Sequence, residues 1–542
     1  MCRMPPSFVS VEHPVQRRSF LAGAAGLGIG LARPALAAGE ARRVLRFVPQ
    51  SDLRVLDPMA TTAYATRNHG HLCWDTLYGL DAELKPQPQL AEGHVVEEDG
   101  RLWTFTLRQG PRFHDGEPVR AQDAVASIRR WMLRDLHGQT LATRLEDIRA
   151  LDDRRFVLRL SRPFGLMLDA LGKASTYPCF IYPERFARQD PSRAFTEVVG
   201  SGPYRYLAEE RAPGSLVAYR RFENYSPAPR GPVSLTAGPK LALFDRLELR
   251  HTPDATVAAE ALQSGQVDWW EQVAPDLRPV LKHDRNLTMD RLDMGGTVAM
   301  LRVNQLHPPF DNPALRRALL PALRQGDFMT AIMGDNRELW RENVGCFPEG
   351  SPIASEAGLE AITGPRDVEA AQRAVRAAGY KGEKVAVLHP TDVVNNSNLT
   401  AVATDLFQRV GLNAETVSCD WAGFLQRRAS RAPVAEGGWS ALVVLFGGMD
   451  LATPAGHPLL RANGERAWFG WPDSPKLEAL RDRWFDTGDL AAQQKLGREI
   501  QRQFFQDLPY YPLGQYLNDS AWRSSLSAPR RGMVLPLNVK RV

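Results

Sequence analysis

The 542-residue sequence lacks the features that mark membrane, metal-binding or nucleic-acid-binding proteins. It has only five cysteines, and no two of them stand in the Cys-x-x-Cys spacing of zinc and redox sites. No stretch approaches eighteen apolar residues, so the sequence predicts no membrane-spanning helix. The 67 basic residues nearly balance the 62 acidic ones. Since no basic block carries interleaved aromatics, we expect no nucleic-acid partner.

Catalytic and nucleotide-binding motifs are missing as well. The sequence contains no P-loop and no His-Glu-x-x-His. Residues 438–442 begin like a nucleophile elbow, but Leu442 stands where that motif needs glycine. The pair His114 and Asp115 lies in a Gly-containing turn that needs no chemistry to explain it. We therefore predict no enzyme, no cofactor and no metal.

The N-terminus reads as an export signal. Arg17 and Arg18 are followed by Phe20, Leu21 and a mildly apolar Gly/Ala-rich run that ends in small residues at Ala37. The order resembles the twin-arginine signal. We expect cleavage near Ala37 and a soluble periplasmic protein. Export permits disulfides, but whether the four cysteines beyond the signal pair or lie buried as thiols stays open; they are Cys73, Cys179, Cys346 and Cys419.

Residues 101–128 carry the densest local pattern. Trp103, Phe105 and Leu107 alternate with polar residues, which predicts a half-buried strand. A turn at Asp115-Gly116 follows, and apolar residues then recur every three or four positions, which predicts an amphipathic helix after Arg120.

Beyond this stretch, predicted strands alternate with predicted helices, as expected of an α/β protein. The helix expected over residues 367–378 has the N-cap Asp367 and the stop Gly379. A last strand is expected near residues 533–539. No repeat or low-complexity linker interrupts the chain, which favours lobes joined by crossing strands.

Several stretches together resemble the peptide/nickel family (family 5) of periplasmic substrate-binding proteins that serve ABC importers, which includes dipeptide- and oligopeptide-binding proteins. The matching stretches are LDP (56–58), DTLYGLD (75–81), PQLAEG (88–93), WTFTLRQGPRFHDGEPVRAQDAVASI (103–128), GSGPYRY (200–206), GQVDWW (265–270), LRVNQLHPPFDNPALRRAL (301–319) and PYYPL (509–513).

The resemblance implies a two-lobed periplasmic-binding-protein fold of type II, cluster C, with a subdomain inserted in lobe I. The expected divisions are the signal (1–37), lobe I first part (38–75), inserted subdomain (76–204), lobe I second part (205–292), lobe II (293–508) and a C-terminal return to lobe I (509–542). A monomer would hold its ligand between the lobes and present it to a membrane permease.

The resemblance also implies ligand-binding residues. Peptide-binding relatives have a Gly-Trp-x-x-Asp segment whose aspartate receives the peptide amine. Here Asp450 keeps the acid, but Gly447 stands in the place of the tryptophan. A carboxylate enclosed between lobes needs a cation, so we expect Asp450 to bind an amine, or else to be a solvated loop residue.

His389 takes the place of an arginine that grips the terminal carboxylate in dipeptide-binding relatives. Because histidine is charged only below about pH 6.5, a free dipeptide is less favoured than a longer peptide or another amine. Trp421 and Phe446 are candidate pocket aromatics, and Asn304 is a candidate for orienting the backbone.

The leading hypothesis is an exported, non-catalytic receptor for a peptide or peptide-like amine. The fold does not determine the ligand, so an oligosaccharide, an opine or a nickel chelate stays an alternative, as does a periplasmic enzyme or chaperone on this scaffold.

Overall fold

The computed structural model describes residues 43–542, and the predicted signal segment lies outside them. Within this range the four cysteines are free thiols, three of them buried. No helix of the described residues is both long and apolar enough to cross a bilayer.

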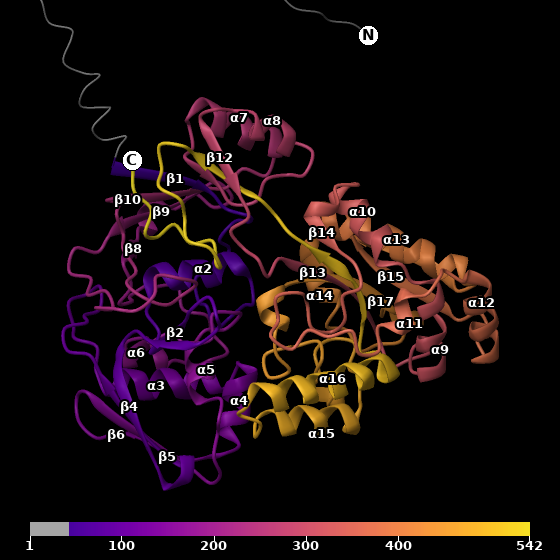
Figure 1. Ribbon diagram of the computed structural model, residues 1–542, viewed down its shortest axis with the longest axis horizontal. Coiled ribbons are helices and arrows are strands. Elements are labelled where there is room, and N and C mark those ends of the chain that lie inside the picture. The colour runs from indigo at the N-terminus through magenta and orange to yellow at the C-terminus, as the bar shows by residue number, and fades with distance from the viewer. Residues whose placement is uncertain (1–42) are drawn as a thin grey trace, which may run out of the picture. The chain divides into compact units, whose positions relative to one another are not determined.

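The first sheet contains seven strands and draws on distant parts of the chain. Their order is β12 (Leu287–Asp290), β19 (Ser520–Arg523), β11 (Trp269–Trp270), β1 (Val44–Val48), β10 (Arg246–Arg250), β9 (Leu216–Arg221) and β8 (Tyr204–Tyr206). The central strand β1 runs parallel to both neighbours. Around this sheet lie α2 (Tyr64–Cys73), α7 (Ala255–Ser264) and α8 (Arg278–Lys282). The C-terminal segment returns to it, because Arg541 pairs with Asp268 beside β11 (Figure 1).

A separate antiparallel sheet confirms the strand and helix predicted for residues 101–128. Its order is β4 (Ala91–Glu97), β5 (Leu102–Leu107), β7 (Arg155–Leu160) and β6 (Leu145–Ala150). Phe105 of β5 stacks on Phe156 of β7 at 5.2 Å between ring centres. The helix α3 (Ala121–Met132) packs on this sheet beside α4 (Leu136–Ala142) and α6 (Glu184–Ala187). A small hairpin of β2 (Tyr78–Leu80) and β3 (Pro86–Pro88) packs against α5 (Met167–Gly172).

The third large sheet has six strands. Their order is β14 (Trp340–Arg341), β18 (Tyr511–Tyr516), β13 (Thr297–Val303), β17 (Ala441–Gly447), β15 (Lys384–Pro390) and β16 (Asn413–Cys419). The helices of this region are α9 (Pro313–Ala318), α10 (Gln325–Met333), α11 (Glu360–Thr363), α12 (Val368–Ala377), α13 (Val394–Arg409), α14 (Trp421–Arg427), α15 (Pro475–Trp484) and α16 (Leu490–Asp507). α12 begins as predicted, since the side chain of Asp367 accepts from the Ala370 N–H.

Two expectations need correction. The chain returns to the first sheet later than residue 509, because β18 pairs along β13 and is buried on both sides in the six-stranded sheet. The predicted strand at 533–539 does not form; this segment follows the first sheet as irregular chain, and only Leu526 and Arg541 form an isolated bridge. The α/β class is confirmed. The division into lobes remains our proposal, with the seven- and four-stranded sheets in lobe I and the six-stranded sheet in lobe II.

Candidate functional site

The chain crosses between the two large sheets at two neighbouring places. Residues 291–296 lead from β12 to β13, and residues 517–519 lead from β18 to β19. Gly296 takes a left-handed φ of 55°, and a Cβ at this position would lie 2.4 Å from the carbonyl oxygen of Tyr516. Only glycine allows this approach. The two crossings therefore lie against each other and form the base of the site.

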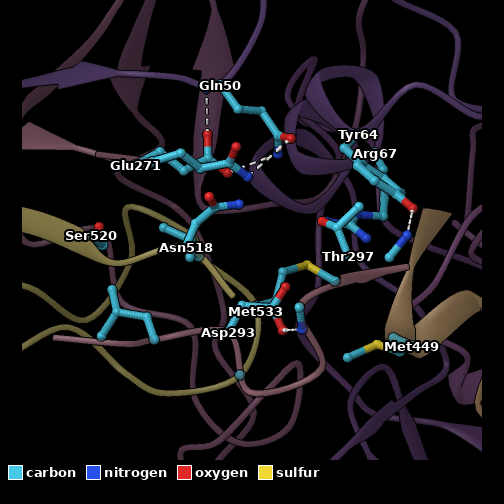
Figure 2. A pocket seen from close by; sticks show the side chains of 16 residues that line it. Gln50, Tyr64, Arg67, Glu271, Asp293, Thr297, Met449, Asn518, Ser520 and Met533 are labelled. Atoms are coloured by element: carbon cyan, nitrogen blue, oxygen red, sulfur yellow. Dashed lines mark hydrogen bonds between the residues drawn. The ribbon is translucent and has the colours of Figure 1, made fainter. Parts of the chain in front are cut away.

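A cavity of about 50 Å³ opens beside these crossings. Residues from both large sheets and from α2 surround it (Figure 2). The polar and charged side chains on its wall are Gln50, Tyr64, Arg67, Glu271, Gln272, Asp293, Thr297, Asn518 and Ser520.

Asp293 lies in the first crossing. Its Oδ1 accepts hydrogen bonds from the N–H groups of Gly295 at 2.9 Å and Gly296 at 3.3 Å, which holds the turn. Within residues 43–542, its Oδ2 has no hydrogen-bond donor. Burial raises the pKa of Asp293, while the charge of Arg67 and the two N–H groups oppose the rise. Asp293 thus offers one free carboxylate oxygen at the cavity.

Glu271 follows the buried strand β11 and is 4% exposed. Its two oxygens accept from the backbone N–H of Gln50 at 2.7 Å and from the Gln50 side chain at 3.0 Å. Burial raises the pKa of Glu271 to about 7, because neither bond supplies a full positive charge. Asp293 is close enough to add to this rise. Glu271 is therefore poised to lose its proton near neutral pH.

Tyr64 and Arg67 lie one turn apart on α2, and the guanidinium carbon of Arg67 stacks 4.5 Å from the centre of the Tyr64 ring. Arg67 donates through Nε and Nη2 to Asn68. In the described part of the chain, no carboxylate lies within 4.0 Å of Arg67, and Nη1 has no acceptor. In Figure 2 this pair lies on the side of the cavity opposite Glu271.

Asp450 is 1% exposed and connects the end of the six-stranded sheet to α2 and to the loop after α5. Its Oδ2 accepts from the Tyr64 hydroxyl at 2.5 Å, and its Oδ1 accepts from the Thr176 N–H at 2.7 Å. The Gly447 N–H also donates to the Tyr64 oxygen. Burial and the Asp450 charge raise the pKa of Tyr64 well above its ordinary value, so the phenol stays a donor. We call these four residues the Asp450 contact.

Gly447 explains why this contact forms. A Cβ at residue 447 would lie 2.9 Å from the Tyr64 hydroxyl oxygen. The tryptophan that the family resemblance implies for this position would therefore occupy the space that Tyr64 fills here. Of the six predicted site residues, Gly447 lines the cavity, and Asp450 lies behind Tyr64 and Gly447.

The other four predicted residues have local partners. His389 shares a 2.7 Å hydrogen bond with Ser397. The Asn304 amide donates to the Trp439 carbonyl and accepts from the Leu306 N–H. The last two are aromatic: Trp421 stacks on Phe424 at 5.0 Å, and Phe446 meets Trp468 edge-on at 6.2 Å. None of the four lines the cavity, and their ligand roles stay predictions.

The sequence analysis did not single out Tyr64, Arg67, Glu271, Asp293 and Asn518. For two of them the sequence held a signal. Glu271 directly follows the buried pair Trp269-Trp270, and Asp293 precedes a Gly-Gly pair between two strands. An acid at the end of a buried strand or in a crossing is the pattern to look for. The positions of Tyr64 and Arg67 on a helix face carry no such mark.

The two large sheets, the double crossing and the cavity beside it define a two-lobed binding-protein fold. Residues 85–449 match the model of the bacterial extracellular solute-binding proteins, family 5 (middle). The chain belongs to this family. The predicted family and fold are thereby confirmed, and so is the prediction of a binding protein rather than an enzyme.

The chain is similar to curated and solved proteins. A probable peptide ABC transporter periplasmic-binding protein, y4tO, of Sinorhizobium fredii is 33% identical over 519 residues, which are 95% of this chain and 97% of that protein. The glutathione-binding protein GsiB of Salmonella typhi is 27% identical over 57% of this chain and 58% of its own. A dipeptide-binding protein from Pseudoalteromonas sp. SM9913, solved with Met-Leu, has a TM-score of 0.73 at 18% identity and covers 92% of this chain and 100% of its own. The binding protein AgaA of A. tumefaciens R10, solved with agropinic acid, has a TM-score of 0.74 at 20% identity over 90% of this chain and 95% of its own.

Proposed function

We propose that this protein is the receptor of an ABC importer for peptides or peptide-like amines. The observation that carries the proposal is the excess of acid at the junction of the lobes. Asp293 and Glu271 line the cavity and Asp450 lies behind it, whereas Arg67 is the one cation on the cavity wall among residues 43–542. Buried carboxylates favour a ligand that brings a positive group. The peptide-transport description of the relative at 33% identity supports the same ligand class.

Ligand capture follows from the position of the site. The cavity and the Asp450 contact both require groups from lobe I and lobe II, so a ligand bound there stabilises the closed arrangement of the lobes. It shifts the equilibrium by its differential affinity for that arrangement. The closed form is the one that a permease would recognise.

A thermal-shift screen tests the ligand class. Di- and tripeptides, oligosaccharides, opines and nickel chelates are each added to the purified protein. We expect peptides or amines to raise the melting temperature, because ligand at a hundred times Kd adds about 2.7 kcal/mol of stability. Stabilisation by oligosaccharides or nickel chelates alone would refute the proposal. Turnover of a stabilising compound would favour an enzyme on this scaffold.

We further propose that the protein is exported by the twin-arginine route, cleaved near Ala37 and active as a periplasmic monomer with an inner-membrane permease. The paired Arg17 and Arg18 support this route. Replacing both with lysine should leave the protein in the cytoplasm with its N-terminus uncleaved. N-terminal sequencing of the periplasmic fraction measures this, and unchanged export of the variant would count against the route.

A further inference from the structure

The cavity wall presents charged groups that the protein itself leaves incompletely paired. Asp293 Oδ2 and Arg67 Nη1 have no hydrogen-bond partner among residues 43–542, although each residue's other polar atoms are engaged. The Asn518 amide, on the same wall, makes no side-chain hydrogen bond within the described chain. All three residues are half-buried, so their open atoms are accessible from the cavity. Unpaired groups of both charges on one cavity wall are available to a ligand that carries the opposite charges.

We propose that the cavity binds a small zwitterion, whose cationic nitrogen pairs with the open oxygen of Asp293, beside Glu271, and whose carboxylate pairs with Arg67. This inference rests on the proposed function and deepens it by naming two charged groups of the ligand. It also assigns the ligand's amine to residues other than Asp450.

Charge explains why both groups are needed. A ligand with only a cation would face Arg67 without compensation, and a ligand with only a carboxylate would face Asp293 and Glu271. A zwitterion pairs each group with its opposite. A bound single-charge analogue covers one charge of the wall without pairing it, which weakens binding.

Asp450 is a poorer amine acceptor in this arrangement. Its two oxygens already accept from Tyr64 and Thr176, and 1% of its surface is exposed. A ligand amine that reached Asp450 would have to displace Tyr64 from Gly447. Asp293 needs no such displacement, because its Oδ2 is open.

The size of the cavity limits the ligand. The cavity's volume of about 50 Å³ is more than one ordered water needs and far less than the roughly 300 Å³ of pockets for drug-sized ligands. An extended oligopeptide does not fit in this volume. The described arrangement favours a ligand of amino-acid size, and a larger one requires the lobes to part further.

The test pairs changes in the ligand with changes in the protein. The probes are the proteinogenic L-amino acids and dialanine, each beside its N-acetyl and its C-terminal amide form, screened by thermal shift at millimolar concentration. Titration calorimetry then measures the strongest probe on Asp293→Asn, Glu271→Gln, Arg67→Gln and Asp450→Asn. Asp290→Asn is the matched control, because Asp290 lies three residues from Asp293 and pairs with Arg531 on the surface.

We expect only forms with both charges to stabilise the protein. Asp293→Asn and Arg67→Gln should each weaken binding at least tenfold, and Asp290→Asn should not. N-acetylation of the ligand should weaken its binding to Asp293→Asn much less than its binding to the unmodified protein, because both changes remove the same contact. On Asp450→Asn, N-acetylation should weaken binding by the same factor as on the unmodified protein.

Other outcomes would overturn the inference. It fails if the strongest probes carry one charge, if no probe stabilises the protein, or if the amine couples to Asp450 and not to Asp293. In the last case the proposed receptor for peptides or amines still stands. If only neutral sugars or metal complexes bind in the wider screen, both this inference and the proposed function fail.

Discussion

Asp450 and Asp293 lie near the same junction of the lobes, within electrostatic reach of each other, but their oxygens are satisfied in different ways. Both oxygens of Asp450 accept hydrogen bonds, one from Tyr64 and one from Thr176. Asp293 keeps one oxygen for its own turn and leaves the other open at the cavity. A carboxylate that the protein satisfies completely holds two parts of the structure together. One that it satisfies by half is available to a ligand.

The same contrast separates Arg67 from the arginine buried in lobe II. Arg302 is fully buried, but it donates to four carbonyl oxygens, those of Phe469, Leu459, Pro509 and Trp468. Burial lowers the pKa of Arg302 to about 9. Four of its five N–H donors are engaged in joining loops. Arg67 donates only to its neighbour Asn68. Arg67 thus differs from Arg302 in its unused hydrogen-bonding capacity, not in its charge.

The largest effect should come from removing the satisfied carboxylate. Asp450→Ala leaves the Tyr64 hydroxyl and the Thr176 N–H without an acceptor, which costs the closed form on the order of 4 kcal/mol at about 2 kcal/mol for each buried donor. Small-angle scattering of the ligand-free protein should then show a larger radius of gyration.

Asp420→Ala is the control for this measurement. It removes an exposed helix N-cap, which accepts from the Gly423 N–H, and should lower the melting temperature slightly without changing the radius. An unchanged radius in Asp450→Ala would mean that the Asp450 contact does not hold the lobes together.

The sequence predicted best those parts whose pattern is local. The alternation of Trp103, Phe105 and Leu107 predicted β5, and the cap Asp367 predicted α12. The strand expected near residues 533–539 did not form, because its apolar residues are buried as irregular chain rather than paired.

The cavity shows why most of the site could not be predicted. Its wall combines Gln50, Arg67, Glu271, Asp293 and Asn518, which are separated by up to hundreds of residues and meet only where the two crossings touch. The resemblance to relatives directed attention to Asp450 and Gly447. It could not indicate that Tyr64 would fill the space of the missing tryptophan, because that depends on the packing of α2 against the other lobe.

A second prediction concerns the pH dependence of stability and tests Glu271 on the cavity wall. The folded pKa of Glu271, about 7, lies above its ordinary 4.5, so the folded state holds the proton more tightly than the unfolded state. The stability from Glu271 is fully present below pH 4.5 and is lost as pH rises through 7. The loss is on the order of 3 kcal/mol at 1.36 kcal/mol for each pKa unit.

Glu271→Gln should remove this loss. Chemical denaturation at pH 5 and pH 8 should show a smaller fall in the free energy of unfolding for the variant than for the unmodified protein. Glu248→Gln is the control, because arginines lower the pKa of Glu248 despite its burial, and its contribution changes in the opposite direction. Equal falls in the unmodified protein and in Glu271→Gln would show that Glu271 does not titrate near neutral pH.

The smallest effect concerns Gly447, which touches both the Asp450 contact and the cavity. Gly447→Ala places a Cβ 2.9 Å from the Tyr64 oxygen and moves the phenol, weakening its hydrogen bonds by about 1 kcal/mol in total. Ligand affinity should fall about fivefold by calorimetry. Gly93→Ala is the control, since a Cβ there meets nothing within 4 Å.

Tyr64→Phe removes the hydroxyl that the new methyl group meets, so adding Gly447→Ala to Tyr64→Phe should reduce ligand affinity almost no further. If Gly447→Ala costs the same in both backgrounds, the glycine does not act through Tyr64, and the Asp450 contact and the cavity are independent of each other.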